Sequence, residues 1–236
     1  MRFIVGLLMA LSAVAALGEG FDQLGSITQP QFRLLSEDLG AALSYKPMVP
    51  AEPLGVTGFD IGLEVSATDL QSAQILDQAT SEDIPEVLPI ARLHAHKGLP
   101  FGIDIGLSYS AIPTFDIELW GGELRYAILK GGAATPALAL RGSFTRLQGV
   151  DQLDIETRAV DLSISKGFTL LTPYAGLGHV WVTSTPNGIP TLAEEDFGLT
   201  KYFAGLNIAL GIVSFAAEAD RTGDAWTYGA KLALRF

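Results

Sequence analysis

The sequence WTYGAKLALRF, residues 226–236, alternates between apolar and polar side chains and ends on an aromatic residue. Successive side chains of a β-strand point to opposite faces, so this segment predicts a strand with two different faces. A strand of about 9–11 residues is the length that a tilted membrane crossing requires, and most strands of soluble proteins are shorter. The apolar face carries Trp226, Tyr228, Ala230, Leu232, Leu234 and Phe236, and the other face carries Thr227, Gly229, Lys231 and Arg235.

The same alternation recurs along the chain and predicts about ten strands. It is clear in residues 58–67, 101–111 and 213–220. Weaker examples lie at 87–96, 115–129, 136–146, 153–165, 169–183 and 199–209. In two of the weaker segments the phase changes, near Gly121 and Gly122 and again between Ile155 and Val160. The first change predicts a β-bulge, because an extra residue reverses the faces of a strand.

The connections between these strands alternate in length. Counting back from Phe236, the turns at 210–211, 166–167, 130–135 and 97–100 are short, whereas 184–198 and 68–86 are long; the link at 112–114 is also short. In outer-membrane barrels the periplasmic turns are short, the extracellular loops are longer and the strand number is even. The pattern therefore predicts an all-β fold, a transmembrane antiparallel β-barrel of about ten strands formed by residues 56–236.

The residues before the barrel divide into two parts. Residues 1–18 combine Arg2, a short apolar stretch and small residues, which predicts a signal peptide. Residues 19–55 fit the strand pattern poorly and indicate a short amphipathic helix with Ser36 as N-cap, followed by a proline-rich linker. We expect a plug in the lumen or a periplasmic lead, or else two more strands that would make a barrel of twelve.

A second helix is expected in the long segment 68–86. Thr68 and Gln71 match a capping box, Leu70, Ala73 and Leu76 follow at helical spacing, and Pro85 would end the helix.

Composition excludes several classes of function. The net charge of −11 argues against nucleic-acid binding, which needs clustered Lys and Arg. The chain has no cysteine, which excludes disulfides and thiolate metal sites. After the N-terminal apolar stretch it has no apolar run of 18 residues, which excludes a membrane-spanning helix. It also has no metal-binding motif and no Gly-x-Ser-x-Gly motif, and no cofactor is expected.

Charged side chains belong on the inward face of such a barrel, because lipid disfavours them on the outside. Mixed signs in a narrow lumen favour a structural ion-pair network over a conduction pathway. The lumen-lining candidates are Asp60, Glu64, Arg92, His94, His96, Asp104, Arg125, Arg141, Glu218, Asp220 and Lys231.

Two groups of residues raise the question of metal binding or catalysis. His94 and His96 lie two apart on one strand face, but Asp104 is the only nearby third ligand, so hydrogen bonding is favoured over a metal site. A lipid-acting barrel enzyme would need Ser108 or Ser110 together with His179, and nothing in the sequence fixes their geometry.

The segment 226–236 resembles the sorting signal of bacterial outer-membrane barrels, in which a terminal aromatic residue and alternating apolar residues are read by the assembly machinery. Trp226, Tyr228 and Phe236 would carry that signal. The segment LSEDLGAALSYKP, residues 35–47, resembles the N-terminal hatch of FadL-type transporters of hydrophobic compounds, with Lys46 in place of the usual asparagine. The resemblance implies a luminal hatch and transport.

The expected location is the outer membrane of a Gram-negative bacterium, with outer-membrane lipid and the barrel assembly machinery as partners. The expected function is a passive pore or transporter for small solutes, hydrophobic ones included. A non-conducting structural or surface-interaction barrel is the alternative, and a lipid-acting barrel enzyme is a third. A soluble lipocalin-like barrel, the rival fold, would have an apolar interior.

Overall fold

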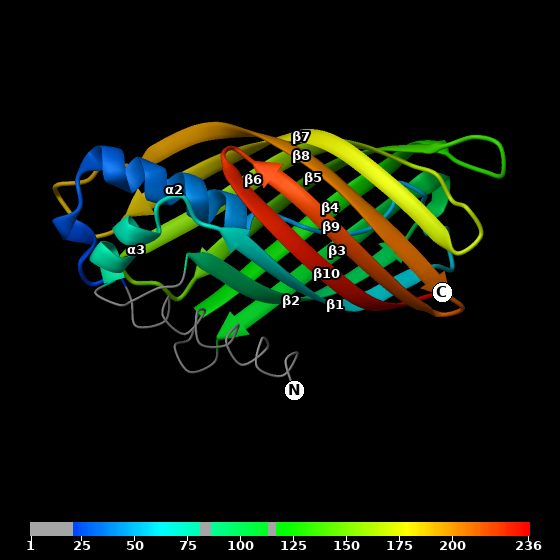
Figure 1. Ribbon diagram of the computed structural model, residues 1–236, viewed down its shortest axis with the longest axis horizontal. Coiled ribbons are helices and arrows are strands. Elements are labelled where there is room, and N and C mark those ends of the chain that lie inside the picture. Colours follow the sequence, from blue (N-terminus) through cyan, green and yellow to red (C-terminus); the bar gives the residue numbers. More distant parts are fainter. Residues whose placement is uncertain (1–20, 81–85, 113–116) are drawn as a thin grey trace.

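The protein is a closed antiparallel barrel of ten strands (Figure 1). The computed structural model describes residues 21–80, 86–112 and 117–236. Each strand pairs with the next in sequence, and β1 pairs with β10 to close the wall. The predicted fold is confirmed, and the twelve-strand alternative is wrong because residues 29–43 form a helix. The strands are β1 (Phe59–Asp69), β2 (Val87–Gly98), β3 (Ile103–Ile112), β4 (Ile117–Lys130), β5 (Ala137–Gln148), β6 (Leu153–Ser165), β7 (Leu171–Pro186), β8 (Glu195–Leu210), β9 (Val213–Thr222) and β10 (Ala225–Arg235).

The two ends of the barrel differ in the length of their connections. One end holds short turns, among them residues 211–212 and the 3-10 helix η3 (Pro100–Gly102). The other end holds the link with helix α3 (Ala73–Thr80) and the loop at 187–194. By the rule for outer-membrane barrels the second is the extracellular, or outer, end. Three predictions lie outside the described residues. They are the signal peptide, the 112–114 link after its first residue, and Pro85 as the end of the helix.

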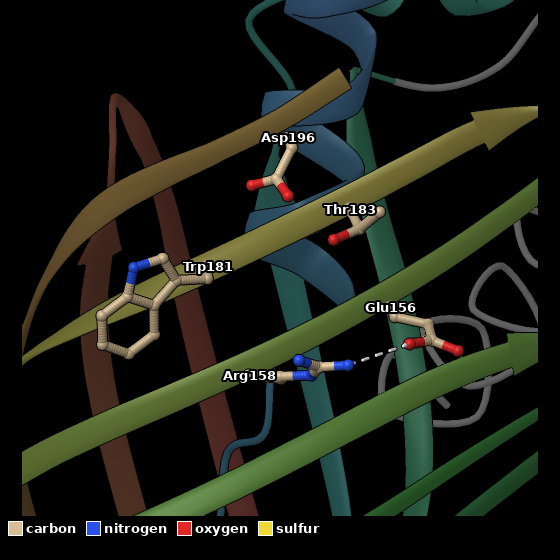
Figure 2. A pocket seen from close by; sticks show the side chains of 5 residues that line it. All are labelled: Glu156, Arg158, Trp181, Thr183 and Asp196. Carbon is tan, nitrogen blue, oxygen red and sulfur yellow. Dashed lines mark ion pairs between the residues drawn. The ribbon is translucent and has the colours of Figure 1, made fainter. Parts of the chain in front are cut away.

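The outside of the wall is apolar over most of its area. Leu63, Leu107 and Leu232 are 48–63% exposed, whereas their neighbours along the strands point inward and are buried. Buried charged side chains fill the middle of the interior while the outside is apolar, so the lipocalin-like alternative, with an apolar interior throughout, is wrong. The apolar outside is interrupted on β6–β8, beside Trp181, by the polar side chains of Glu156, Arg158, Thr183 and Asp196 (Figure 2). No helix in the described part of the chain is long and apolar enough to cross a bilayer.

Residues 21–58, which we call the plug segment, occupy the lumen. The segment begins with the 3-10 helix η2 (Leu24–Ser26) and helix α2 (Gln29–Leu43) at the outer end, beside α3 (Figure 1). It then runs extended to the inner end, where Gly98 donates its N–H to the Gly58 carbonyl over 3.1 Å. Prolines within 47–53 keep this part from continuing the helix.

Helix α2 begins earlier than the sequence indicates. Thr28 is its N-cap, and Gln31 completes a capping box with it. The prediction of Ser36 as N-cap is therefore wrong: Ser36 lies in the middle of the helix, where its hydroxyl donates to Ser184 Oγ over 2.9 Å. Its position is compatible with either role from sequence alone, because the contact to Ser184 is long-range.

The helix expected in the outer loop is present, but its predicted cap is wrong. Helix α3 covers Ala73–Thr80, whereas Thr68 lies within β1 and its hydroxyl is 2.9 Å from that of Thr227 on β10. The start of α3 is held instead by α2, because Asp38 accepts hydrogen bonds from the N–H and the hydroxyl of Ser72.

The outer half of the lumen is an apolar core. Phe32, Leu35 and Leu39 of α2 pack there against inward-facing residues of the wall, all of them buried. The wall residues in this core include Ile117, Leu119, Leu153, Ile155, Val180 and Val182.

This core explains why two predicted phase changes are absent. β3 pairs continuously with β4 past Gly121 and Gly122, and β6 pairs continuously with both neighbours. The apolar residues at the outer ends of β4 and β6 point inward to the core, so the strand keeps its phase while its inward face changes from polar to apolar. The bulge in β4 lies instead between Ala127 and Leu129.

Candidate functional site: the closed lumen

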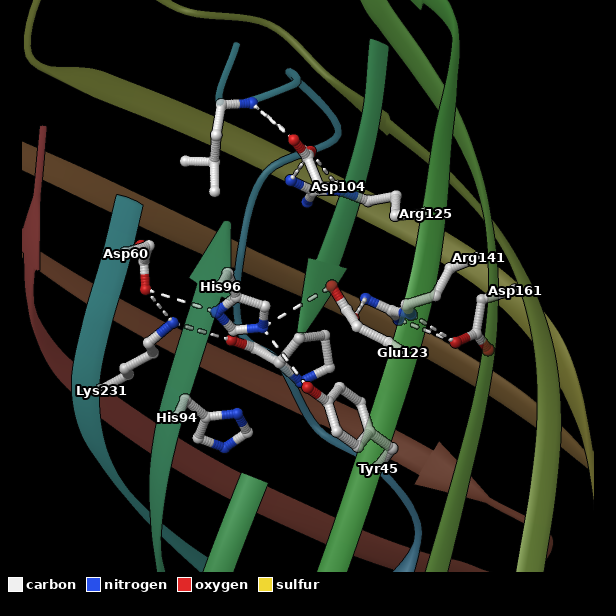
Figure 3. Close-up of polar contacts among 12 residues, drawn as sticks. Tyr45, Asp60, His94, His96, Asp104, Glu123, Arg125, Arg141, Asp161 and Lys231 are labelled. Carbon is white, nitrogen blue, oxygen red and sulfur yellow. Dashed lines mark hydrogen bonds and ion pairs between the residues drawn. The ribbon is translucent and has the colours of Figure 1, made fainter. Parts of the chain in front are cut away.

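The middle of the lumen holds a set of buried acidic and basic side chains, two histidines among them, that we call the charged layer (Figure 3). Its members face inward by the alternation of their strands and are at most 7% exposed. They are Asp60, Glu64, Arg92, His94, His96, Asp104, Glu123, Arg125, Arg141, Asp161, Lys201, Glu218, Asp220 and Lys231.

Within the wall these residues pair across neighbouring strands. Arg92 donates to Glu64 over 2.8 Å, and Arg141 donates to Asp161 over 2.7 Å. Two further pairs follow the same pattern, Arg125 with Asp104 and Lys231 with Asp60, each at 2.6 Å. Buried charges of opposite sign offset part of each other's desolvation cost, which is why the layer can exist away from water.

The same cations hold the backbone of the plug segment. Arg92 donates to the carbonyl of Ala42 over 2.6 Å, and Arg125 donates to the carbonyl of Pro50 over 2.6 Å. Lys201 and Lys231 donate in the same way to the carbonyls of Tyr45 and Pro47, over 3.0 and 3.2 Å. Backbone groups without secondary structure need such partners when they are buried. The charged layer therefore provides the hydrogen-bond partners that water would otherwise give to this extended segment.

The plug segment also places one charge of its own in the layer. Lys46 is fully buried, and its ammonium group donates to Asp220 over 2.7 Å. Two N–H groups of the segment donate to the wall, that of Ala51 to Ser165 Oγ over 3.0 Å and that of Leu54 to Asp104 over 3.1 Å. The wall therefore binds both the N–H groups and the carbonyl groups of the plug segment.

His94 and His96 are stacked, with ring centroids 5.7 Å apart (Figure 3). His94 Nε2 lies 2.5 Å from Glu64, and His96 lies 3.6 Å from Asp60 and 3.6 Å from Glu123. Within the described residues, no group of three or more His, Asp or Glu side chains is arranged to hold a metal ion. Asp104, the nearest third ligand by sequence, is paired with Arg125 instead.

The structure buries every residue that the sequence proposed for the lumen, and it adds four. Glu123, Asp161 and Lys201 lie on the inward faces of β4, β6 and β8, and Lys46 lies in the plug segment. The alternation in the sequence could have found Asp161, which lies between Val160 and Leu162. The signal is weaker for Glu123, which follows a glycine, and for Lys201, which follows a threonine. Nothing in the sequence indicates the burial of Lys46.

The lumen is filled at this level. A water-filled channel would expose the side chains that border it, yet Glu64, Arg92 and Lys46 are at most 2% exposed. In this conformation a hydrated ion has no path through the charged layer, which acts as the support of the plug segment.

At the outer end of the barrel, Asp38 connects α2 with the start of α3. Burial raises the pKa of its carboxyl group, although the two hydrogen bonds from Ser72 act in the opposite direction. A second connection joins α2 to the outer end of β8, where Arg33 and Gln29 both donate to Glu195, over 3.2 and 2.5 Å.

The residues considered for catalysis lie on opposite faces of the wall. Ser108 on β3 is buried and faces the lumen, whereas His179 on β7 is on the outward face, where it contacts Trp181. Ser108 and His179 therefore do not come together in one catalytic constellation.

The aromatic residues near the strand ends face outward, as girdles at the two membrane interfaces do. Trp181, Tyr202 and Trp226 are exposed on the wall, and the rings of Phe59 and Phe236 lie 5.6 Å apart at the inner end. Recognition of Trp226, Tyr228 and Phe236 by the assembly machinery stays a prediction.

Comparison with known proteins gives likenesses of fold. No protein-family model and no curated protein matches the sequence. Among solved structures, the N-terminal β-barrel domain of Pseudomonas aeruginosa OprF is similar, with 14% identity, a TM-score of 0.39 and coverage of 75% of this chain and 97% of that chain. For Ail of Yersinia pestis the identity is 13%, the TM-score 0.33 and the coverage 76% and 97%. For the KdgM porin the identity is 9%, the TM-score 0.38 and the coverage 75% and 99%.

The resemblance to FadL-type transporters stays a prediction. The closed wall pairs the backbone hydrogen-bonding groups of every strand with a neighbouring strand, and its outside is apolar. Its lumen is filled by an apolar core in the outer half and by the charged layer in the middle. The chain is a β-barrel of the bacterial outer membrane.

Proposed function

We propose that the plug segment closes this barrel at rest and that small solutes, including hydrophobic ones, pass through the lumen when the segment moves. The observation that carries the proposal is the kind of contact that holds residues 44–58. Wall cations bind the carbonyls of this part of the segment, and water can replace such hydrogen bonds. The wall itself is complete without the segment, because its ten strands close on one another.

A second function is a non-conducting structural or surface-interaction barrel. It is favoured by α2, whose Phe32, Leu35 and Leu39 are buried in the apolar core at the outer end. Full burial of each such side chain contributes about 1.5–3 kcal/mol, so moving α2 out of the barrel has a substantial cost. The loops around α2 would then meet an external partner.

A disulfide that fixes α2 to the wall separates the two functions. The chain has no cysteine, and the hydroxyl oxygens of Ser36 and Ser184 are 2.9 Å apart, so S36C/S184C can form a bond between α2 and β7. The matched control is T68C/T227C, whose oxygens are also 2.9 Å apart but join β1 to β10 within the wall. Both variants are inserted into vesicles, and entry of arabinose and of the dye N-phenylnaphthylamine is measured before and after reduction.

If the plug segment must move, oxidised S36C/S184C has the leakage of protein-free vesicles and regains flux on reduction, whereas T68C/T227C keeps the wild-type flux in both states. Equal flux through oxidised and reduced S36C/S184C would show that movement of α2 is not required. Wild-type vesicles that never exceed the protein-free background, for either solute, would leave the non-conducting barrel as the function.

A further inference from the structure

The lipid-facing side of the wall carries a groove over β3–β6. Its floor is Gly142 on the outward face of β5, and the ring of Phe144 covers Gly122 on β4. Outward-facing apolar side chains border it, and it is a shallow, open hollow of about 690 Å³. The apolar borders are Ile105, Leu107, Leu124 and Phe144.

The groove exists because glycine leaves the wall thin. A Cβ atom added at Gly142 would have no other atom within 4 Å, so open space lies directly above this residue. Leu124, its partner on β4, stands more than half exposed beside that space. A hydrocarbon chain can therefore lie deeper here than on a wall of larger side chains.

Arg158 on β6 joins the groove to a second hollow. The register places Gly122, Phe144, Arg158 and Trp181 in one row across β4–β7. Arg158 lines the groove, and it also lines the hollow of about 320 Å³ that Glu156, Trp181, Thr183 and Asp196 border (Figure 2). The two hollows meet at Arg158, and the groove is apolar toward the membrane centre whereas the second hollow is polar and lies toward the outer end.

The charges of the polar part are of both signs. The side chain of Arg158 is 78% exposed, and its contact to Glu156 is 3.8 Å long. Glu156 is shared with Arg146, at 3.4 Å. A guanidinium on the lipid-facing side needs an anionic partner, and phosphate provides one with bidentate hydrogen bonds. The carboxylates of Glu156 and Asp196 beside the Trp181 ring suit an ammonium group in the same way.

We propose that this surface binds one phospholipid whose headgroup carries both a phosphate and an ammonium group. The phosphate binds Arg158, the ammonium group lies between Glu156, Asp196 and the Trp181 ring, and an acyl chain occupies the groove over Gly142. The site lies on the outside of the wall, so it is independent of whether the plug segment moves.

The test uses full-length protein in detergent, with dioleoyl phosphatidylethanolamine or dioleoyl phosphatidylglycerol added and bound lipid counted by native mass spectrometry. Both probes have the phosphate, but only the first has the ammonium group. Gly142→Leu fills the groove in open space, Arg158→Gln removes the phosphate partner, and E156Q/D196N removes the carboxylates. Ala230→Leu and Arg221→Gln make the same kinds of change on the outward face of β9 and β10.

We expect one phosphatidylethanolamine per wild-type barrel, bound roughly tenfold more tightly than phosphatidylglycerol because one charge-assisted contact distinguishes them. Gly142→Leu and Arg158→Gln weaken both lipids roughly tenfold or more, and E156Q/D196N removes the preference while the two control variants behave as wild type. Wild-type binding by Gly142→Leu and Arg158→Gln would overturn the proposal. So would equal binding of both lipids by the wild type, or a protein dimer that Gly142→Leu dissociates. Gly142→Ala serves where the leucine variant fails to fold.

Discussion

The ion pair between Lys46 and Asp220 predicts how strongly the plug segment and the wall depend on each other. Both side chains are at most 1% exposed, and their 2.7 Å contact lies in the charged layer. Removing one partner leaves the other charge buried with little compensation. Among the described residues, the hydrogen bond left to Asp220 is that from the hydroxyl of Thr222, at 3.0 Å. Such a loss costs about 3–5 kcal/mol. We therefore expect Lys46→Met to lower the free energy of unfolding by about that amount.

The assay is urea unfolding of the protein inserted in vesicles, followed by the fluorescence of its tryptophans, which face outward. A double variant, K46M/D220L, removes both charges, and we expect it to recover most of the lost stability because buried ion pairs are often neutral relative to apolar replacements. Arg221→Gln, which breaks an exposed pair with Asp224, is the control and should cost about 0–1 kcal/mol. A cost for Lys46→Met as small as that of the control would refute the burial of this pair.

Three further predictions concern other parts of the molecule. Leu63→Arg places a charge on the lipid-facing side of β1 and should lower the stability of the inserted barrel by about 2–4 kcal/mol, a loss absent if this face met water. Gly40→Leu should lower the free energy of unfolding by about 1–3 kcal/mol, because a Cβ at Gly40 would lie 2.6 Å from Val182 Cγ2 and force α2 away from β7. Unchanged urea unfolding would contradict that contact. Because burial raises the pKa of Asp38 above its ordinary 3.8, its contribution to stability is full below that pH and is lost as pH rises through the folded-state pKa. A pH series should show that slope in the wild type and lose it in Asp38→Asn, while a slope equal in both would assign it to other groups.

The fold could be predicted from sequence because the alternation is local. Residues such as Leu232 and Lys231 reveal their faces through their immediate neighbours, and the short turns of the inner end mark the strand boundaries. The inward direction of most of the charged layer follows from the same rule. These features need no knowledge of what fills the barrel.

The contents of the lumen could not be predicted in the same way. Ile117 and Leu153 point inward although they are apolar, because α2 covers them, and from sequence alone they imitate a change of phase. The burial of Lys46 depends on Asp220, which lies 174 residues away. Long-range contacts of this kind leave no periodic signal in the sequence.

The access of water to the plug segment tests the central claim most directly. Ser44 and Ala51 are at most 1% exposed, so cysteines at these positions should not react with a small water-soluble thiol reagent while the barrel is folded in vesicles. A cysteine in place of Ala134, in an exposed inner turn, should react at once, and all three should react after unfolding. Labelling of the Ser44 and Ala51 positions in the folded barrel as fast as at Ala134 would show that the lumen is open to water.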